Sequence, residues 1–156
     1  MKGFRYTMLA RPTTVNGVTY RSMLEARWGV FLELRGWSPE YEPCDLGDWV
    51  PDFRIECYVP RHLHYTFEGR AGVLVEVKPI RTVDIYDESH CALAGNTCDL
   101  WDEHKPTRTE DTCWLVGETP DYVWHFHKGA LEQHPIYGWG TAWNRACAVT
   151  QWRPAR

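Results

Sequence analysis

Residues 73–80 read VLVEVKPI, and this stretch decides the predicted fold. Three valines and a leucine make it an apolar run, yet Glu76 and Lys78 lie within it. Successive side chains of a β-strand point to opposite faces. The valines therefore share one face, and Leu74, Glu76 and Lys78 share the other. The pattern predicts a core strand that presents an acid and an amine together on one side of a sheet.

The segments before this strand predict a hairpin, a helix and a second strand. Residues 15–20, VNGVTY, contain Asn-Gly between β-branched residues, which is a hairpin-turn signal. The segment from Ser22 to Arg35 has apolar residues at near-helical spacing, with Ser22 as a good N-cap and Gly36 as a good C-terminal stop. Residues 48–60, DWVPDFRIECYVP, alternate so that apolar and charged side chains fall on opposite faces of a strand.

The segments after residue 80 complete a mixed α/β pattern. One helix is predicted around Tyr86–Ala94, within an acidic and turn-rich segment. Residues 112–117 and 121–127 predict two strands that are antiparallel to each other, and residues 141–152 predict a C-terminal helix. Helices and strands in this order favour an α/β arrangement around one sheet. The length of 156 residues predicts a single domain, residues 1–156.

Composition limits the class of protein. No apolar stretch is long enough to predict a membrane span, and the N-terminus lacks the apolar region of a secretory signal. We therefore expect a cytoplasmic protein whose six cysteines are reduced, mostly as small buried apolar residues. The net charge is −4, which disfavours nucleic-acid binding. Residues 1–35, however, carry six basic and two acidic groups and form a candidate phosphate-binding region.

Two carboxylates are predicted to meet on this sheet. If the strands of residues 48–60 and 73–78 pair near these positions, Asp52 and Glu76 lie on one side of the sheet. Two adjacent carboxylates repel, so one takes up a proton unless a cation lies between them. Hard oxygen ligands suit Mg²⁺ or Mn²⁺. Such an ion polarises a phosphate and lowers the pKa of bound water, while Lys78 holds that water or stabilises negative charge on phosphate oxygens.

These residues resemble the PD-(D/E)xK nuclease superfamily. The resemblance is carried by P-D at 51–52 and E-V-K at 76–78, and it extends to R-S-M-L-E at 21–25 and Y-E-P at 41–43. Within the superfamily the chain is similar to phage-encoded endonuclease-like proteins and to the endonuclease subunit of Tn7-type transposases. The resemblance implies a restriction-endonuclease-like α/β core, a mixed central β-sheet flanked by helices.

The resemblance also implies an activity, the hydrolysis of DNA with Mg²⁺ or Mn²⁺ as cofactor. An endonuclease is expected in preference to an exonuclease. The active-site roles fall on Glu25, Asp52, Glu76 and Lys78. Asp52 and Glu76 would bind the metal, with the backbone carbonyl of Val77 as a further ligand. A phage-encoded nuclease would act in the cytoplasm of its bacterial host, alone, as a homodimer or with a protein partner. The residues expected to contact nucleic acid are Arg21, Arg27, Arg61, His62 and Arg70.

Several alternatives stay open. Ser22 and Glu25 have the spacing of a capping box, in which Glu25 caps a backbone N–H. Glu76 and Lys78 could form a solvent-facing stripe on an antiparallel strand. The chain could also be an inert nuclease-fold module that binds a protein partner through residues 82–122, which carry two basic and ten acidic groups.

A structural zinc site is a weaker alternative, because the chain has no C-x-x-C pair. Its ligands would come from His90, Cys91, Cys98 and Cys113.

Overall fold

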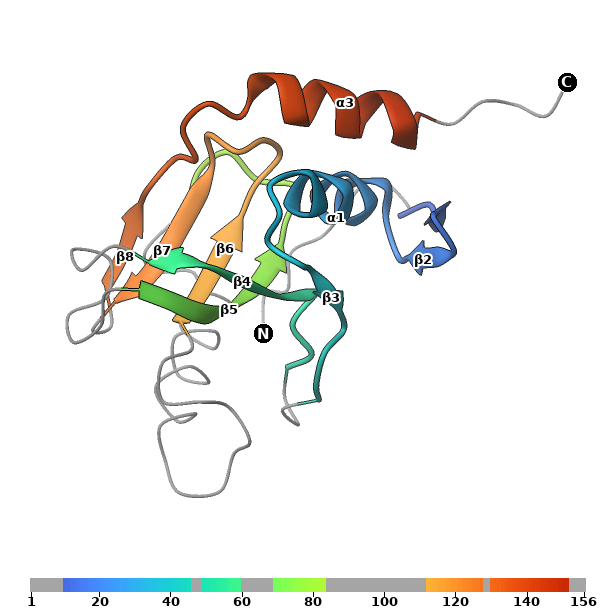
Figure 1. The fold of residues 1–156 in the computed structure, drawn as a ribbon. Coiled ribbons are helices and arrows are strands. Elements are labelled where there is room, and N and C mark those ends of the chain that lie inside the picture. The colour runs from blue at the N-terminus through green and yellow to red at the C-terminus, as the bar shows by residue number, and fades with distance from the viewer. Residues whose placement is uncertain (1–9, 46–48, 60–68, 84–111, 128–129, 152–156) are drawn as a thin grey trace, which may run out of the picture.

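The computed structural model describes residues 10–45, 49–59, 69–83, 112–127 and 130–151. It folds them into a mixed α/β structure with one six-stranded sheet (Figure 1). Two helices, α1 (Met23–Leu34) and α3 (Gly140–Thr150), lie over the same face of this sheet. Within the described ranges, neither helix combines the length and the apolar character needed to cross a bilayer.

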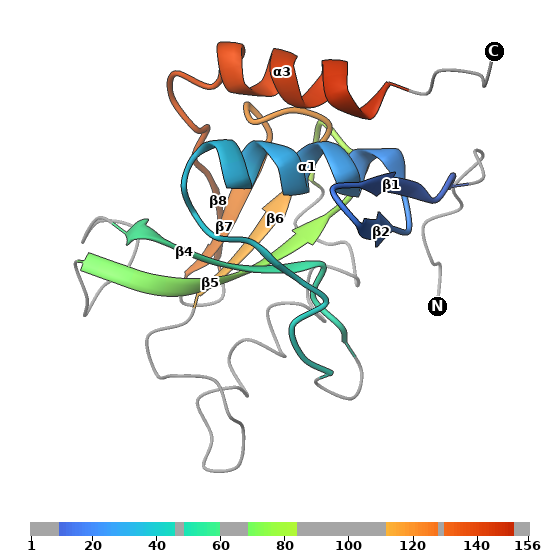
Figure 2. The same ribbon diagram turned by 45° about the vertical axis from the view of Figure 1, so that its right-hand side comes forward.

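The predicted mixed sheet is present. Its strand order is β3-β4-β5-β6-β7-β8, in which β5 and β6 are parallel and every other neighbouring pair is antiparallel. A separate two-stranded antiparallel sheet, β1-β2, lies beside α1 (Figure 2). The strands are β1 (Thr13–Val15), β2 (Val18–Tyr20), β3 (Glu40–Tyr41), β4 (Phe53–Val59), β5 (Gly69–Val77), β6 (Thr112–Val116), β7 (Val123–His127) and β8 (Ala130–Gln133).

Local signals account for the N-terminal hairpin and α1. Asn16 and Gly17 between β1 and β2 have φ values of 50° and 82°, the left-handed conformation that a type I′ turn requires. Ser22 is the N-cap of α1, and its Oγ accepts a hydrogen bond from the backbone N–H of Glu25 at 3.1 Å. Gly36 has a φ of 72°, which ends the helix as predicted.

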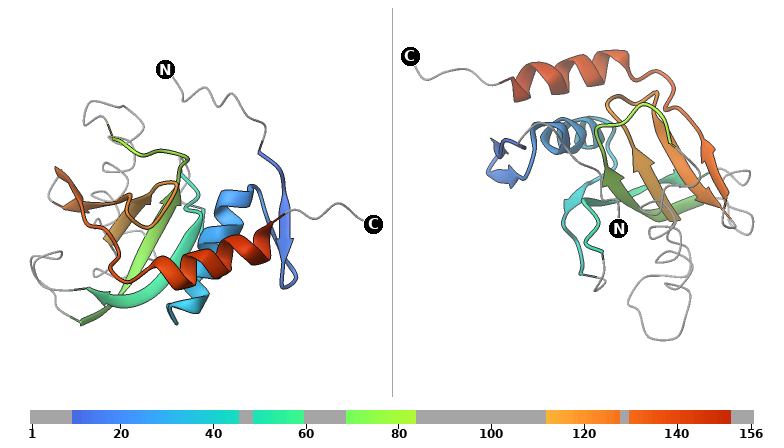
Figure 3. Two further views of the ribbon diagram at one scale, coloured as in Figure 1. Left: turned by 90° about the horizontal axis from the view of Figure 1, so that it is seen from above. Right: turned by 180° about the vertical axis from the view of Figure 1, so that it is seen from behind.

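The helix-covered face of the sheet carries the larger hydrophobic core. Both helices contribute to it, and the ring centroids of Trp28 in α1 and Trp143 in α3 lie 5.1 Å apart. Viewed from above, α3 passes over α1 on the side away from the sheet (Figure 3). The indole of Trp28 donates a 2.8 Å hydrogen bond to the carbonyl of Gly117, which ties α1 to the end of β6. The strand residues in this core include Phe53, Ile55, Cys57, Val73, Val75, Val77, Trp114, Val116 and Val123.

The opposite face of the sheet carries a second, smaller apolar cluster and the acidic residues of interest. The buried members of the cluster are Trp49, Leu74, Cys113, Leu115 and Trp124. The alternation predicted for β4 and β5 is therefore confirmed, because the valines of β5 belong to one core and Leu74 to the other.

The described cysteines, Cys44, Cys57, Cys113 and Cys147, form no disulfide. Cys57 and Cys113 are buried, as expected for small apolar residues, and the other two are half-buried.

Two strands differ from prediction. Strand β8 was not predicted, since Ala-Leu-Glu-Gln at 130–133 contains no β-branched or aromatic residue. Strand β5 begins at Gly69 rather than at Val73, because the Gly-Arg-Ala-Gly segment is extended by its pairing with β4. The helix predicted around Tyr86–Ala94 lies outside the described residues.

Candidate functional site

Strand register brings Asp52 and Glu76 together. The antiparallel ladder between β4 and β5 ends with Phe53 opposite Val75. Continued by one position, this register places Asp52 opposite Glu76, and Oδ2 of Asp52 accepts a hydrogen bond from the backbone N–H of Val77, the residue after Glu76. Residues directly opposite in an antiparallel pair have Cβ atoms about 4.5–5.5 Å apart. The two carboxylates, 24 residues apart in the sequence, are therefore neighbours in the fold.

Glu76 is held at both of its carboxylate oxygens. Its Oε1 forms an ion pair with Nζ of Lys78, and its Oε2 accepts a 2.8 Å hydrogen bond from the indole N–H of Trp49. Lys78 follows the last residue of β5, where its backbone N–H donates to the carbonyl of Val116 at 2.9 Å. Glu76 is 7% exposed, so it is not part of a solvent-facing stripe.

Asp52 is the most deeply buried acid of the site, with 2% of its surface exposed. Its Oδ2 accepts a 2.7 Å hydrogen bond from the backbone N–H of Val77, and its Oδ1 forms an ion pair with Nη2 of Arg21. A buried carboxylate needs such partners, because burial of an unpaired charge is costly. The position of Asp52 thus depends on two elements that are distant in sequence, β5 and the start of α1.

Glu25 joins the site from the first turn of α1. Its Oε1 accepts a 2.9 Å hydrogen bond from the hydroxyl of Ser22, and its Oε2 accepts one of 2.6 Å from the phenol of Tyr41. Ser22 therefore caps the helix and contacts the Glu25 carboxylate at the same time. Burial, together with the hydrogen bond to Glu25, raises the pKa of Tyr41 to about 12, so Tyr41 remains a neutral donor.

The acids influence one another through their charges. Burial raises the pKa of Asp52 to about 7, and the negative charges of Glu76 and Glu25 act in the same direction. The backbone N–H of Val77 and the ammonium of Lys78 oppose this rise. We call Glu25, Asp52 and Glu76, with Arg21 and Lys78, the carboxylate cluster. Crowding of its acids favours the uptake of a proton or a cation near neutral pH.

The donor chemistry of the cluster suits a hard divalent cation. Asp52, Glu76 and the carbonyl of Val77 supply only oxygen, which Mg²⁺ and Mn²⁺ prefer. As the described side chains stand, however, no group of three or more His, Cys, Asp and Glu is spaced to hold a metal ion. Each of the six carboxylate oxygens of Glu25, Asp52 and Glu76 instead accepts from a protein donor. An ion entering the cluster would have to replace some of these donors.

The residues predicted to bind nucleic acid have different positions. Arg21 lies in the carboxylate cluster, with 56% of its side chain exposed. Arg27 is half-buried in α1 and donates to Sδ of Met23 at 3.0 Å. Arg61 and His62 lie outside the described residues, as does the side chain of Arg70. Three of the proposed zinc ligands, His90, Cys91 and Cys98, also lie outside them.

Three further residues belong to the site although the sequence assigned them no role. Trp49 holds Glu76, Tyr41 holds Glu25, and Oε1 of Glu42 pairs with Nε of Arg21 at 3.1 Å. Two of them stand in the Y-E-P motif, which was recognised only as part of a resemblance. A buried tryptophan N–H usually has an acceptor, but the burial of Trp49 is visible only in the fold, so no signal in the sequence could have identified this contact.

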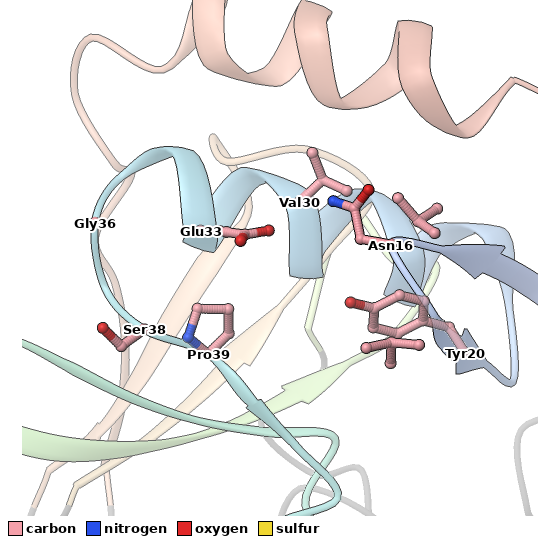
Figure 4. Close-up of a pocket in the computed structure, with 9 residues that line it drawn as sticks. Asn16, Tyr20, Val30, Glu33, Gly36, Ser38 and Pro39 are labelled. Carbon is pink, nitrogen blue, oxygen red and sulfur yellow. The ribbon is translucent and has the colours of Figure 1, made fainter.

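A pocket of about 390 Å³ lies between α1 and the β1-β2 hairpin (Figure 4). Val30 and Glu33 reach it from α1, and Asn16 and Tyr20 reach it from the hairpin. The loop after α1 closes it at Ser38 and its neighbour Pro39. None of its lining residues belongs to the carboxylate cluster.

Comparison of the chain with models of known protein families, with curated proteins and with solved structures finds no match.

Proposed function

We propose that the protein is a metal-dependent DNA nuclease of the PD-(D/E)xK type, with a restriction-endonuclease-like core, and that it hydrolyses phosphodiester bonds at the carboxylate cluster. The observation that carries this proposal is the placement of Asp52 opposite Glu76, with the amine of Lys78 paired to Glu76 on the same side. Two carboxylates and an amine at one point of a sheet form the set that metal-assisted phosphodiester cleavage needs.

The charge balance supports a cation at this position. Four acids meet here, namely Glu25, Glu42, Asp52 and Glu76, and among the residues that the structure describes their basic partners are Arg21 and Lys78. Four negative groups against two positive groups leave the site short of positive charge at a pH where all are ionised. A bound Mg²⁺ or Mn²⁺ would make up this deficit and stabilise the burial of Asp52 and Glu76.

The residues of the cluster divide into those that would hold the ion and those that would act on the water or the phosphate. Asp52, Glu76 and the carbonyl of Val77 would hold the ion, which when bound polarises the phosphate and acidifies a water. Lys78 holds the attacking water or stabilises the negative charge that develops on the phosphate oxygens. Glu25 orients that water or contributes to a second metal site. Endonucleolytic cleavage is the form we propose.

Nicking of a supercoiled plasmid tests the proposal. Cleavage is expected with Mg²⁺ or Mn²⁺ and is expected to stop on addition of EDTA. Lys78→Met is expected to lower the rate by about 10²–10³-fold, the typical cost of removing one group that stabilises transition-state charge. Glu76→Gln removes a charged ligand of the proposed ion, so it is expected to lower the rate through loss of the metal.

Matched controls are available for both substitutions. Glu56→Gln removes an exposed acid of β4, on the same face of the sheet as Glu76. Arg81→Met removes an exposed base three residues after Lys78. Each control residue forms an ion pair at the surface, and such pairs contribute little to stability, so both variants are expected to keep full activity. Full activity in a Glu76→Gln, Lys78→Met double variant would remove the assignment.

One observation favours a second candidate, an inert nuclease-fold module that binds a protein partner. All six carboxylate oxygens of the cluster already have protein donors, which is what a purely structural network requires. The partner would be engaged by the acidic segment 82–122. Calorimetric titration with Mn²⁺ separates the candidates, because the nuclease is expected to bind at least one ion and the inert module none.

A further inference from the structure

Arg21 connects the acids of the site from a single position. Its Nε lies 3.1 Å from Oε1 of Glu42 and 3.7 Å from Oε2 of Glu25, and its Nη2 pairs with Oδ1 of Asp52. The three acids come from three segments, which are α1, the residue after β3 and the residue before β4. One guanidinium thus supplies positive charge at the place where a divalent cation is proposed to bind.

The partners of this ion pair differ in how firmly they are fixed. Asp52 is 3% exposed as a side chain and is anchored by the N–H of Val77, whereas the Arg21 side chain is 56% exposed. Arg21 also precedes the N-cap residue Ser22, so its side chain is outside the helix and its long stem is accessible to solvent. When the pair separates, the guanidinium is therefore the group that moves.

A guanidinium released from carboxylates is suited to a phosphate. Arginine recognises both groups through paired N–H donors in the same planar geometry. Movement of Nη2 of Arg21 from Asp52 to a DNA phosphate would exchange one charge-assisted contact for another of the same kind. It would also free Oδ1 of Asp52 as a ligand.

We propose that Arg21 is a removable internal counter-ion, which competes with the divalent cation for Asp52 and transfers to a DNA phosphate when that cation binds. This inference rests on the proposed nuclease function and concerns the regulation of the same site. Arg21 is a positioning residue here. The exchange makes metal binding and DNA binding mutually favourable, because each removes the competitor of the other.

Calorimetric titration with Mn²⁺ in the absence of DNA tests the competition. Arg21→Gln removes the competing charge, so it is expected to bind Mn²⁺ at least about fivefold more tightly than the unmodified protein. Arg21→Lys keeps a positive charge and is expected to bind Mn²⁺ as weakly as the unmodified protein. Arg35→Gln, at the other end of α1 and over the Trp37 ring, is the control for loss of a charge from this helix.

The purely structural role of Arg21 gives the opposite result. If Arg21 only holds Asp52 in place, the Mn²⁺ affinity of Arg21→Gln is equal to or weaker than that of the unmodified protein. This result overturns the role of Arg21 as a competitor of the ion. Metal-dependent cleavage by the unmodified protein would still support the nuclease. If the unmodified protein and Arg21→Gln both fail to bind Mn²⁺ and no cleavage occurs, the proposed function itself is rejected. Thermal unfolding of each variant establishes that the titrated protein is folded.

A second arm tests the transfer to phosphate. In the Lys78→Met background, which is expected to bind metal but to cleave slowly, the affinity for a labelled DNA duplex is measured by fluorescence anisotropy with and without Mn²⁺. Mn²⁺ is expected to raise this affinity about tenfold with Arg21 present, and to have a much smaller effect in the Arg21→Gln, Lys78→Met double variant. An equal effect of Mn²⁺ in both proteins would contradict the transfer.

Discussion

The two faces of the six-stranded sheet are built from the same strands but have different chemistry. Beneath the helices, the side chains of β4 and β5 are apolar and buried against aromatic rings of α1 and α3. On the opposite face, the intervening positions of β5 carry Leu74 and Glu76, and Asp52 lies close to them as the residue before β4. Alternation along a strand allows one segment to serve stability on one side and charge on the other. Substitutions on the helix-covered face should therefore lower stability, whereas substitutions at the carboxylate cluster should change pH dependence and metal affinity.

The largest expected effect is on the helix-covered face. Phe31→Ala removes a fully buried ring that contacts Trp28, Trp37 and Trp143 at centroid distances of 5.4, 6.5 and 5.6 Å. We expect the free energy of unfolding to fall by about 3–5 kcal/mol, from lost burial and the cavity left behind. Urea unfolding measures this loss.

The same helix provides the control. Leu34→Ala truncates a side chain that is 40% exposed, and we expect a loss of about 1 kcal/mol or less. The Mn²⁺ affinity of folded Phe31→Ala should equal that of the unmodified protein. A clear change in that affinity would show that the two faces are not independent.

A smaller effect, which depends on pH, is expected on the opposite face. Burial and the neighbouring acids raise the pKa of Asp52 in the folded protein to about 7, so this carboxyl stabilises the fold when protonated. That contribution is fully present below the unfolded-state pKa near 3.9, and is lost as the pH rises through about 7. Asp52→Asn abolishes it, so the stability of the unmodified protein relative to this variant should fall by a few kcal/mol between pH 5 and pH 8.

Thermal unfolding in EDTA across this pH range measures the difference. Glu56→Gln, an exposed acid on the same face of β4, should have the same pH profile as the unmodified protein. A profile for Asp52→Asn that parallels the unmodified protein would mean that Asp52 does not titrate in this range.

The smallest expected effect concerns a single donor. Trp49→Phe keeps most of the buried ring but removes the N–H that holds Oε2 of Glu76 at 2.8 Å. Groups that orient a metal-binding carboxylate typically contribute 10-fold or more to affinity, so we expect about tenfold weaker Mn²⁺ binding, measured by calorimetry. Trp124→Phe is the control, since Trp124 belongs to the same apolar cluster and stacks on Tyr122. Equal Mn²⁺ affinities for the two variants would exclude a positioning role for Trp49.

Elements with strong local signals could be predicted from the sequence. The Asn-Gly turn, the Ser22 cap and the Gly36 stop each depend on the conformation of one or two residues, and all three are present. Strand β8 and the first residues of β5 could not be predicted, because their extended conformation comes from pairing with a neighbouring strand.

The same distinction holds for the carboxylate cluster. Asp52, Glu76 and Lys78 could be proposed from the alternation within two strands and from a motif. The contacts of Trp49 and Tyr41 could not, since they depend on side-chain positions 27 and 16 residues away in the sequence. Arg21 was expected to meet phosphate because of its charge alone. Only the fold places it against Glu25, Glu42 and Asp52.

Two of the described cysteines, Cys57 and Cys113, are buried in different apolar clusters. Cys57 packs with the helix-covered core, and Cys113 packs in the smaller cluster, where burial raises the pKa of its thiol well above the usual value. A thiol in that state resists alkylation until the surrounding structure opens. The rate of alkylation of each thiol, measured by peptide mass spectrometry, would therefore report how fast its own side of the sheet opens. The two thiols would give separate rates for the two sides.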